Sequence, residues 1–300
     1  MAPPDINLTP TAACFEIEAT KADLNRSPTT YRLQARSWGN PNDCQSAILL
    51  VHGLGAHSGW FEALARRLKV RNLFVLSYDQ AGFGKRRKER FNSSKQWFDD
   101  LTIAFKYLQS LVADKPVFLA GNSMGALVSL STATTLINPA GLIMLSPGFA
   151  GHPRTFSLAY KITTLVKAKL NPDKEFDLPY GLELVSELDS VRAWLENDPD
   201  KRFSVPGRML TELLLLTQKL NSKKPVLNCP AIMLTAGRDR IVDNKVNYQI
   251  FKKLVSRSKE TRAFPDSIHD LTLNIVVEQL ADELTSWMQA CAPGKVAANP

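Results

Sequence analysis

The sequence lacks an apolar run long enough to cross a membrane, and its start lacks the basic region and apolar core of a signal peptide. We therefore expect a soluble, cytoplasmic protein. Internal repeats and low-complexity tracts are also missing, and the charged fraction is only 22%. These absences argue against repeat, fibrous and disordered chains.

Cysteine is scarce, and the four residues present, Cys14, Cys44, Cys229 and Cys291, lie far apart. None forms a C-x-x-C pair or has the local spacing of a zinc site, so no metal site is expected. Free thiols in a reducing compartment are favoured over disulfides.

The chain has 300 residues, of which 44% are hydrophobic. This is enough for one large α/β domain with an insertion, or for two domains. The formal net charge of +8 permits attraction to anionic membranes, nucleic acids or acidic substrates, but it does not choose among them.

Apolar runs with the length of buried strands recur along the chain, with helical patterns between them. Strands are expected at 14–19, 30–36, 46–52, 73–79, 116–121, 141–146, 231–236 and 261–264. Helices are expected at 59–68, 94–112, 124–136, 244–255 and 271–290. Strands that alternate with helices predict an α/β fold, with a mostly parallel sheet covered on both faces.

This alternation stops at residue 147 and resumes after residue 225. The segment between is mainly helical in pattern, for example at 157–170 and 206–220. We interpret it as a helical cap inserted over the ends of the strands. The expected domains are thus a first part of the core at 1–146, the cap at 147–225, and a second part of the core at 226–300.

The strongest motif is the G-x-S-x-G at residues 121–125, between a predicted strand and a predicted helix. Such a turn exposes the serine hydroxyl above the sheet and points the positive end of a helix at a developing oxyanion. The same letters in an ordinary turn would mean little. The strand before and the helix after favour Ser123 as a nucleophile.

A nucleophilic serine needs a base, and the chain offers only His52, His57, His152 and His269. In this fold the order along the chain is Ser, acid, His. The first two histidines precede Ser123, and no acidic residue lies between Ser123 and His152. His269, in a loop before the last predicted helix, is therefore the predicted base.

The acid should follow a strand between the serine and the histidine. Asp239 comes first after the strand at 231–236 and is the predicted acid, which would hold the imidazole tautomer and stabilise the imidazolium. Asp243 is the alternative. A helix N-cap is the favoured role for Asp243.

An oxyanion hole needs two backbone N–H donors. Met124, the residue after the nucleophile, is expected to supply one, and Leu54, in the loop after the strand at 46–52, the other. His52, at the start of that loop, is expected to be structural.

Four blocks of sequence resemble one branch of the α/β hydrolases: VHGLGAHSGWFEALARRL at 51–68, YDQAGFGKR at 78–86, PVFLAGNSMGALVSL at 116–130, and GRDRIVD with SIHD near the end. The branch is that of the monoacylglycerol lipases and lysophospholipases, also described as serine aminopeptidase S33-like. The resemblance runs from about residue 46 onward, and the segment 147–225 matches in position and helical character.

The resemblance implies a triad of Ser123, Asp239 and His269, with oxyanion donors at Leu54 and Met124. It implies hydrolysis of a single-chain lipid ester, such as a monoacylglycerol or a lysophospholipid, without metal or cofactor. In that branch the cap covers an acyl pocket and can touch membranes, so peripheral, transient membrane contact is open here too.

The chain departs from the branch at two positions beside the nucleophile. It has Asn122 where the branch usually carries His, and Ala126 where the branch usually carries Gly. The D-x-x-G-H-G-x-S block of the branch also reads DQAGFGKR here, at 79–86. No triad position is changed.

Two surface features have bland and functional interpretations. Basic residues lie at 85–88 and at Arg90, and the cap adds four lysines. For these residues a solvated basic surface is favoured over docking onto anionic lipid. The sequence has no motif of a nucleic-acid-binding fold. The lysines are Lys161, Lys167, Lys169 and Lys174. Apolar cap residues could line an acyl pocket or simply pack: Phe149, Phe156, Leu158, Tyr160, Ile162, Leu165 and Val166.

Three alternatives to a lipid esterase remain. A peptidase or a thioesterase could use the same triad, and Glu183, Glu187 or Glu196 could hold the ammonium group of an aminopeptidase substrate. A binding protein that kept the fold is the third, although such proteins commonly lose a triad residue and this chain has all three.

Overall fold

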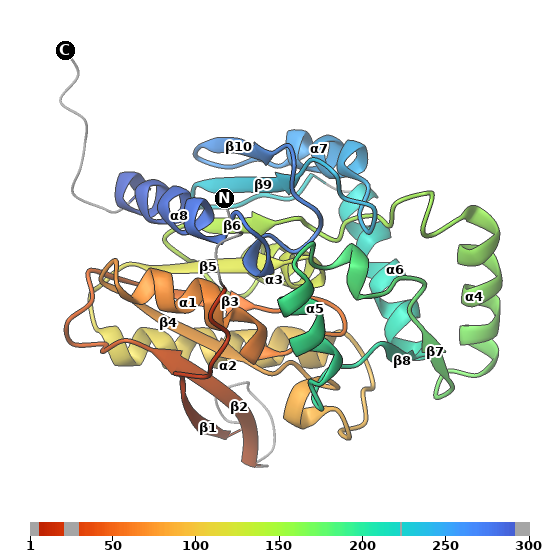
Figure 1. Cartoon of the computed structure of the whole chain (residues 1–300), viewed down its shortest axis with the longest axis horizontal. Coiled ribbons are helices and arrows are strands. Elements are labelled where there is room, and N and C mark those ends of the chain that lie inside the picture. The colour runs from red at the N-terminus through yellow and green to blue at the C-terminus, as the bar shows by residue number, and fades with distance from the viewer. Residues whose placement is uncertain (1–5, 21–29, 223, 292–300) are drawn as a thin grey trace.

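The computed structural model describes residues 6–20, 30–222 and 224–291. Its main sheet has eight strands in the order β1-β2-β4-β3-β5-β6-β9-β10 (Figure 1). They are β1 (Ala13–Thr20), β2 (Thr30–Trp38), β3 (Ser46–Val51), β4 (Leu73–Tyr78), β5 (Val117–Asn122), β6 (Leu142–Leu145), β9 (Ala231–Ala236) and β10 (Lys259–Phe264).

The sheet is parallel from β4 to β10, and only β1 and β2 run antiparallel to their neighbours. Each of the eight expected strands is present in it. The expected α/β class, with a mostly parallel sheet, is therefore confirmed.

Helices cover both faces of the sheet because its central strands are apolar on both sides. In β3, Ala47 and Leu49 pack on one face and Ile48 and Leu50 on the other. The first face is covered by α2 (Lys95–Val112), α3 (Met124–Ala133) and α7 (Asn244–Lys253). The second is covered by α1 (Glu62–Lys69) and α8 (Val277–Cys291).

The last helix starts later than expected. Residues 271–290 were predicted to be one helix, but a short 3-10 turn, η5 (Leu271–Leu273), precedes α8. Asp270 caps the turn by accepting the N–H of Thr272 at 3.0 Å. Asn274 then adopts an extended backbone, with φ −124° and ψ 171°, so the helix cannot run through it.

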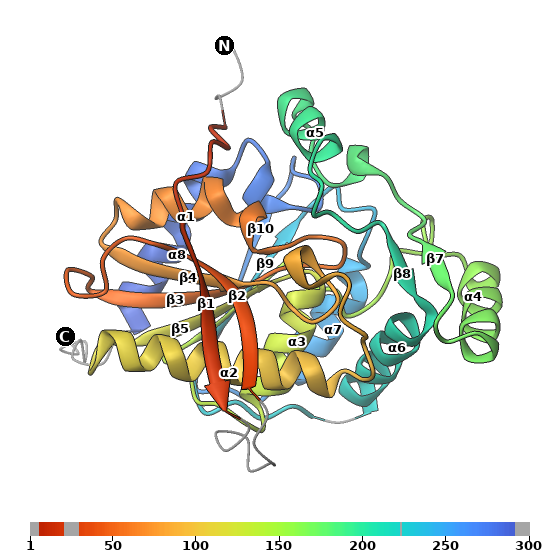
Figure 2. The same ribbon diagram turned by 90° about the horizontal axis from the view of Figure 1, so that it is seen from below.

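The segment between β6 and β9 contains both helices and strands. Its elements are α4 (Leu158–Leu170), β7 (Glu175–Asp177), η4 (Leu182–Leu184), α5 (Asp189–Glu196), β8 (Ser204–Pro206) and α6 (Gly207–Ser222). The antiparallel pair of β7 and β8 was not expected from the mainly helical pattern. These elements gather at one side of the sheet, with α4 outermost (Figures 1 and 2).

Hydrogen bonds attach this segment to the loops that follow the strands. Arg202 donates its N–H to the carbonyl of Gly55, after β3, at 2.8 Å. Asp270, after β10, donates its N–H to the carbonyl of Val185 at 3.2 Å. The segment thus contacts the carboxyl-end loops of the parallel strands, where ligands bind in open α/β sheets.

Within the described ranges, no helix is both long enough and apolar enough to cross a membrane.

Candidate active site

Ser123 forms the turn between β5 and α3, with φ 54° and ψ −117°. A positive φ outside glycine costs about 1–3 kcal/mol and persists only where the surroundings hold it. Three backbone hydrogen bonds do so: Ser123 donates to Leu145 at 2.9 Å, and its carbonyl accepts from Ala126 at 3.0 Å and from Gly148 at 2.9 Å. This is the strained strand-to-helix turn of a nucleophile elbow.

The two glycines of the motif make room for the turn. A Cβ on Gly121 would lie 2.3 Å from the carbonyl oxygen of Gly125, and one on Gly125 would lie 2.0 Å from that of Val51. Both neighbours are backbone atoms that cannot swing aside. Ser123 is partly exposed, whereas the rest of the motif is buried, so its hydroxyl is the accessible group.

His269 and Asp239 lie side by side in the loops after β10 and β9. The Nδ1 of His269 lies 2.7 Å from Oδ2 of Asp239, and both residues are buried. Oδ1 of Asp239 accepts the N–H groups of Ile241 at 2.8 Å and Val242 at 2.9 Å. Because a carboxylate only accepts, the imidazole proton lies on Nδ1 and Nε2 keeps its lone pair.

The environment of His269 favours its charged form overall. Burial has the largest influence and opposes the charge, but the charge of Asp239, its hydrogen bond and the charge of Asp270 act the other way. Together they raise the pKa of His269 above its ordinary value of 6.5. Such a base is suited to accept a proton from a weak acid.

Asp243, the alternative acid, has another contact. Its side chain accepts the N–H of Lys245 at 2.9 Å as the N-cap of α7. The geometry therefore matches the helix-capping role favoured for Asp243, and it gives the contact with His269 to Asp239.

The segments that carry the two predicted oxyanion donors meet at the nucleophile. Met124 is the first residue of α3, where backbone N–H groups have no partner within the helix. The loop of Leu54 begins at Gly53, and a Cβ on Gly53 would lie 3.2 Å from the Cβ of Ser123. The loop is therefore close enough to Ser123 to take part in the same site.

The side chain of His52 stabilises the loop that carries Leu54. Its Nε2 accepts the N–H of Gln80 at 3.0 Å, so Nδ1 carries the proton and donates to the carbonyl of Gly53 at 2.9 Å. Burial, the largest influence, lowers the pKa of His52 to about 4. A neutral, fully bonded imidazole fits the structural role expected for it.

Sequence reasoning gave no role to Asp79, which orders two loops beside the site. Its carboxylate accepts the N–H of Ser58 at 2.9 Å, the hydroxyl of Ser58 at 2.6 Å and the N–H of Lys85 at 2.9 Å. The position of Asp79 directly after β4 is the signal that could have indicated it, since strand ends carry site residues in this fold class.

A second set of side-chain contacts links the residues after β3 to the residues after α5. Oδ2 of Asp198 accepts the Nε1–H of Trp60 at 2.8 Å and lies 2.8 Å from Nε2 of His57. Burial is the largest influence and raises the pKa of Asp198. The hydrogen bond and charge of His57, together with the hydrogen bonds from Trp60 and the backbone of Asp200, outweigh it and lower that pKa to about 2. No local pattern in the sequence indicates this pair, whose members lie 141 residues apart.

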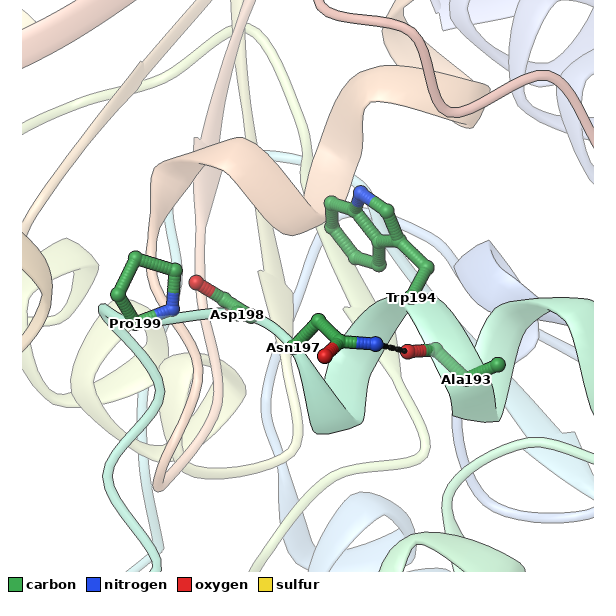
Figure 3. Close-up of a pocket in the computed structure, with 5 residues that line it drawn as sticks. All are labelled: Ala193, Trp194, Asn197, Asp198 and Pro199. Carbon is green, nitrogen blue, oxygen red and sulfur yellow. Dashed lines mark hydrogen bonds between the residues drawn. The ribbon is translucent and has the colours of Figure 1, made fainter.

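A pocket lies beside the Asp198 contacts, at the end of α5. Figure 3 shows its lining residues, Ala193, Trp194, Asn197, Asp198 and Pro199, with Asn197 donating to the carbonyl of Ala193 at 2.8 Å. None of them is a predicted catalytic residue.

The basic run at 85–90 is in part the solvated face that the sequence favours, because Lys85, Lys88 and Arg90 are exposed, but Arg86 is not. Arg86 is buried and pairs with Asp100 at 2.7 Å, because an unpaired carboxylate of α2 would be costly there. Lys85 and Arg87 both pair with Asp200, each at 2.7 Å. The run therefore binds the core to the 147–225 segment.

The apolar residues of the 147–225 segment, for which an acyl pocket and simple packing are both open from the sequence, differ in burial. Leu158, Ile162 and Val166 lie on the outer side of α4 and are 73%, 55% and 53% exposed, whereas Phe149 is buried in the core. The side chain of Phe156 packs against Tyr180, with ring centroids 6.0 Å apart. Helical spacing alone could not tell an outward apolar face from an inward one.

The three glutamates considered for an ammonium site differ. Glu183 and Glu196 are exposed. Glu187 is partly buried, and its Oε1 has no hydrogen-bond partner among the described residues. The N–H of Glu187 donates to Asn274 at 2.8 Å, which places it beside the loop that follows His269.

The described part of the chain holds no group of three or more His, Cys, Asp or Glu side chains able to bind a metal ion. The four cysteines, all within that part, are unpaired.

Comparison with known proteins gives the family. Residues 42–275 match the family described as serine aminopeptidase, S33. The human monoglyceride lipase is 27% identical over 279 residues, which cover 89% of this chain and 90% of that protein. These two matches confirm the resemblance that the sequence blocks indicated.

Solved structures agree on the fold. A soluble variant of the Saccharomyces cerevisiae monoglyceride lipase, in complex with a substrate analogue, superposes with a TM-score of 0.83 at 20% identity, covering 98% of this chain and 100% of that one. The Paleococcus ferrophilus monoacylglycerol lipase gives 0.75 at 21% identity, covering 86% and 99%. The chain therefore belongs to the serine aminopeptidase S33 family of α/β hydrolases, in its monoglyceride lipase branch, and is a serine ester hydrolase.

Proposed function

We propose that the chain hydrolyses the ester of a single-chain lipid, of monoacylglycerol or lysophospholipid type, through an acyl-enzyme on Ser123. The observation that carries this proposal is the buried pair of His269 and Asp239, 2.7 Å apart, at the sheet edge that also holds the strained Ser123 turn. A nucleophile, a base and an orienting acid are the groups that acyl transfer needs.

In the first half-reaction, Nε2 of His269 takes the proton of the Ser123 hydroxyl while Oγ attacks the ester carbonyl. Asp239 stabilises the imidazolium that forms. The tetrahedral intermediate then collapses, the bond to the alcohol oxygen breaks, and His269 returns the proton to the leaving glycerol or glycerophosphoryl alcohol.

In the second half-reaction, water attacks the acyl-enzyme, and His269 removes its proton. Collapse of the second tetrahedral intermediate releases the fatty acid and restores the Ser123 hydroxyl. The backbone N–H groups of Leu54 and Met124 would stabilise the oxyanion in both halves, at about 3–4 kcal/mol for one such donor.

Contact with a lipid surface is supported by α4. Leu158, Ile162, Val166 and Leu170 recur every fourth residue along this helix and are between 53% and 74% exposed. Residues at that spacing lie on one helix face, and exposed lysines, including Lys161, lie beside it. We infer a cytoplasmic enzyme whose 147–225 segment acts as a cap and touches membranes transiently.

A substrate panel tests the proposed function. We expect purified protein to hydrolyse monoacylglycerols or lysophospholipids with a kcat/KM at least about tenfold above that for acyl-CoA thioesters and aminoacyl anilides, a difference of about 1.4 kcal/mol. The Ser123→Ala variant should be inactive on every member. Preference for thioesters or anilides would replace the lipid-ester assignment and leave the triad standing.

Glu187 supports a second candidate, hydrolysis of aminoacyl substrates. Its buried and unpartnered Oε1 is the kind of group that could pair with a substrate ammonium. If this is its role, Glu187→Gln should raise KM for aminoacyl anilides and leave KM for neutral esters unchanged. The lipid ester remains our conclusion, because the outer face of α4 agrees with it.

A further inference from the structure

The residues next to the predicted nucleophile and base contact each other. Asn122, the last residue of β5, precedes Ser123, and Asp270 follows His269. Nδ2 of Asn122 donates to Oδ2 of Asp270 at 2.8 Å. The two residues are 3% and 4% exposed, so the hydrogen bond is shielded from water. It joins the nucleophile turn directly to the loop of the base.

Asp270 is held from its other sides as well. Its Oδ1 accepts the N–H of Thr272 at 3.0 Å and the hydroxyl of the same residue at 2.6 Å. Its backbone carbonyl accepts from Asn274 at 2.8 Å, and its N–H donates to Val185 at 3.2 Å. The carboxylate therefore cannot turn without losing bonds, and it offers Asn122 a fixed partner.

Asn122 makes this bond at a cost. Its Oδ1 is buried and has no hydrogen-bond partner among the described residues. A buried polar atom without a partner destabilises the fold, and an apolar side chain would avoid that loss. Stability alone thus gives little reason for an asparagine here, which points to a role for its Nδ2 contact.

We propose that Asn122 and Asp270 are positioning residues, whose buried hydrogen bond fixes the place of Ser123 relative to His269. This inference rests on the proposed function, since it takes Ser123 as nucleophile and His269 as base. A displacement of about 1 Å between reacting groups can cost about 100-fold in rate, so one bond between their neighbours is enough to matter.

Asp270 also acts on the charge of the base. The titratable groups that act on His269 are Asp239 and Asp270, and both favour the imidazolium. Burial is the largest influence on Asp270 and raises its pKa above the ordinary value of 3.8, although its bonds to Thr272 and Asn122 and the charge of His269 act in the opposite direction.

Asn122→Ala tests the positioning role on a small soluble ester, 4-nitrophenyl butyrate. We expect kcat to fall about 10- to 100-fold with KM changed less than about threefold, because the turn loses its tie while the binding surface stays. Thermal unfolding checks that the variant is folded. A kcat within about twofold of wild type would overturn the proposal.

Asp270→Asn removes the charge of the Asp270 side chain while allowing a hydrogen bond with Asn122, so it separates the effects of the two. The amide introduced by this substitution can keep the contacts with Thr272 through its oxygen, and its NH₂ group can donate to Oδ1 of Asn122 once the Asn122 amide turns over. We expect a smaller loss of kcat than in Asn122→Ala, and an acid limb of kcat/KM displaced to lower pH. A loss as large as that of Asn122→Ala, or an unmoved limb, would contradict the assignment.

A swapped pair provides the sharpest test, and it does not depend on Asn122→Ala folding. Asn122→Asp alone sets two carboxyl groups face to face and should be slower than Asn122→Ala. Adding Asp270→Asn restores a donor opposite the new carboxylate, and kcat should recover at least about tenfold over the single variant. Absence of recovery would overturn the proposal.

Asn247→Ala is the matched control, since Asn247 is also a buried asparagine with an unpartnered Oδ1, on α7. It should affect thermal stability and leave kcat within about twofold. Ser123→Ala keeps the two hypotheses apart. If that variant remains active, the proposed function fails; if it is inactive while Asn122→Ala is unaffected, only this inference fails.

Discussion

The central sheet and helix α4 of the 147–225 segment differ in how many of their residues are buried. Strands β3, β4, β5, β6 and β9 bury every one of their residues, whereas the thirteen-residue α4 buries only Ala168. The predicted catalytic groups lie on loops held by the sheet. Hydrogen bonds and ion pairs attach the segment to those loops, and its outermost helix, α4, presents an apolar face outward.

The difference indicates a division of labour. Rigid strands fix the geometry that acyl transfer requires, because a close-packed core resists displacement. The largely exposed helix α4 can change the surface it presents without disturbing the reacting groups. We therefore expect substitutions in the core to change the chemistry, and substitutions in the segment to change access and surface binding.

The largest expected effect separates Asp239 from Asp243. Asp239→Asn would keep the contacts with Ile241 and Val242 but present an N–H to Nδ1 of His269, which forces the wrong tautomer. We expect kcat to fall about 10⁴-fold. Asp243→Asn keeps an equally good helix cap and should change kcat less than about twofold. Steady-state kinetics on one ester decides, and equal losses in the two variants would refute the assignment of Asp239.

A pair of glycine substitutions compares the two regions by stability. In Gly125→Ala the new Cβ would meet the carbonyl oxygen of Val51 at 2.0 Å, so unfolding free energy should fall by about 1–3 kcal/mol or more. In Gly181→Ala it would meet the exposed, flexible carboxylate of Glu183, which can move aside, and the change should stay within about 0.5 kcal/mol. Chemical denaturation measures both. Equal losses of unfolding free energy in the two variants would contradict the proposed difference between the core and the segment.

The pH profile sharpens the account of the base. His269 must be neutral to accept the serine proton, and its pKa is raised above 6.5 by Asp239 and Asp270 in spite of burial. Activity should therefore fall as the pH drops through a value above 6.5, and Asp239→Asn should move this limb to lower pH. The measurement is kcat/KM against pH. A wild-type limb below 6.5 would contradict the electrostatic picture.

The smallest effect on catalysis is expected from α4. Leu158→Ser with Ile162→Ser should leave kcat on a soluble ester within about twofold and stability within about 0.5 kcal/mol, because both side chains are exposed. Binding to anionic lipid vesicles should fall about tenfold or more, since each buried leucine contributes about 1.5–3 kcal/mol. Thr163→Ser, on the same helix, is the control. Unchanged vesicle binding would rule out this face as the contact.

Much of the core could be predicted because its strands carry a one-dimensional signal. Continuous apolar runs such as 46–52 and 231–236 are readable without knowing their neighbours, and the order of Ser123, Asp239 and His269 along the chain is a rule of the fold. The bond between Asn122 and Asp270 could not be predicted, because it joins residues 148 apart through a loop geometry that no local pattern encodes.

Outside the core, prediction failed where burial rather than spacing decided the outcome. Arg86 is charged yet buried, because Asp100 lies opposite it, and Leu158 is apolar yet exposed, because nothing in the described structure covers that side of α4. The predicted start of the last helix was wrong for a related reason. Asn274 bonds to Val185, a partner 89 residues away.

The central claim is that Ser123 is the nucleophile of this hydrolase, and covalent labelling tests it most directly. Wild-type protein treated with a fluorophosphonate should gain one adduct by intact mass, and peptide mapping should locate it on Ser123. Ser123→Ala should gain none under the same conditions. Labelling of Ser123→Ala equal to that of wild type, or an adduct on any other residue, would contradict the account.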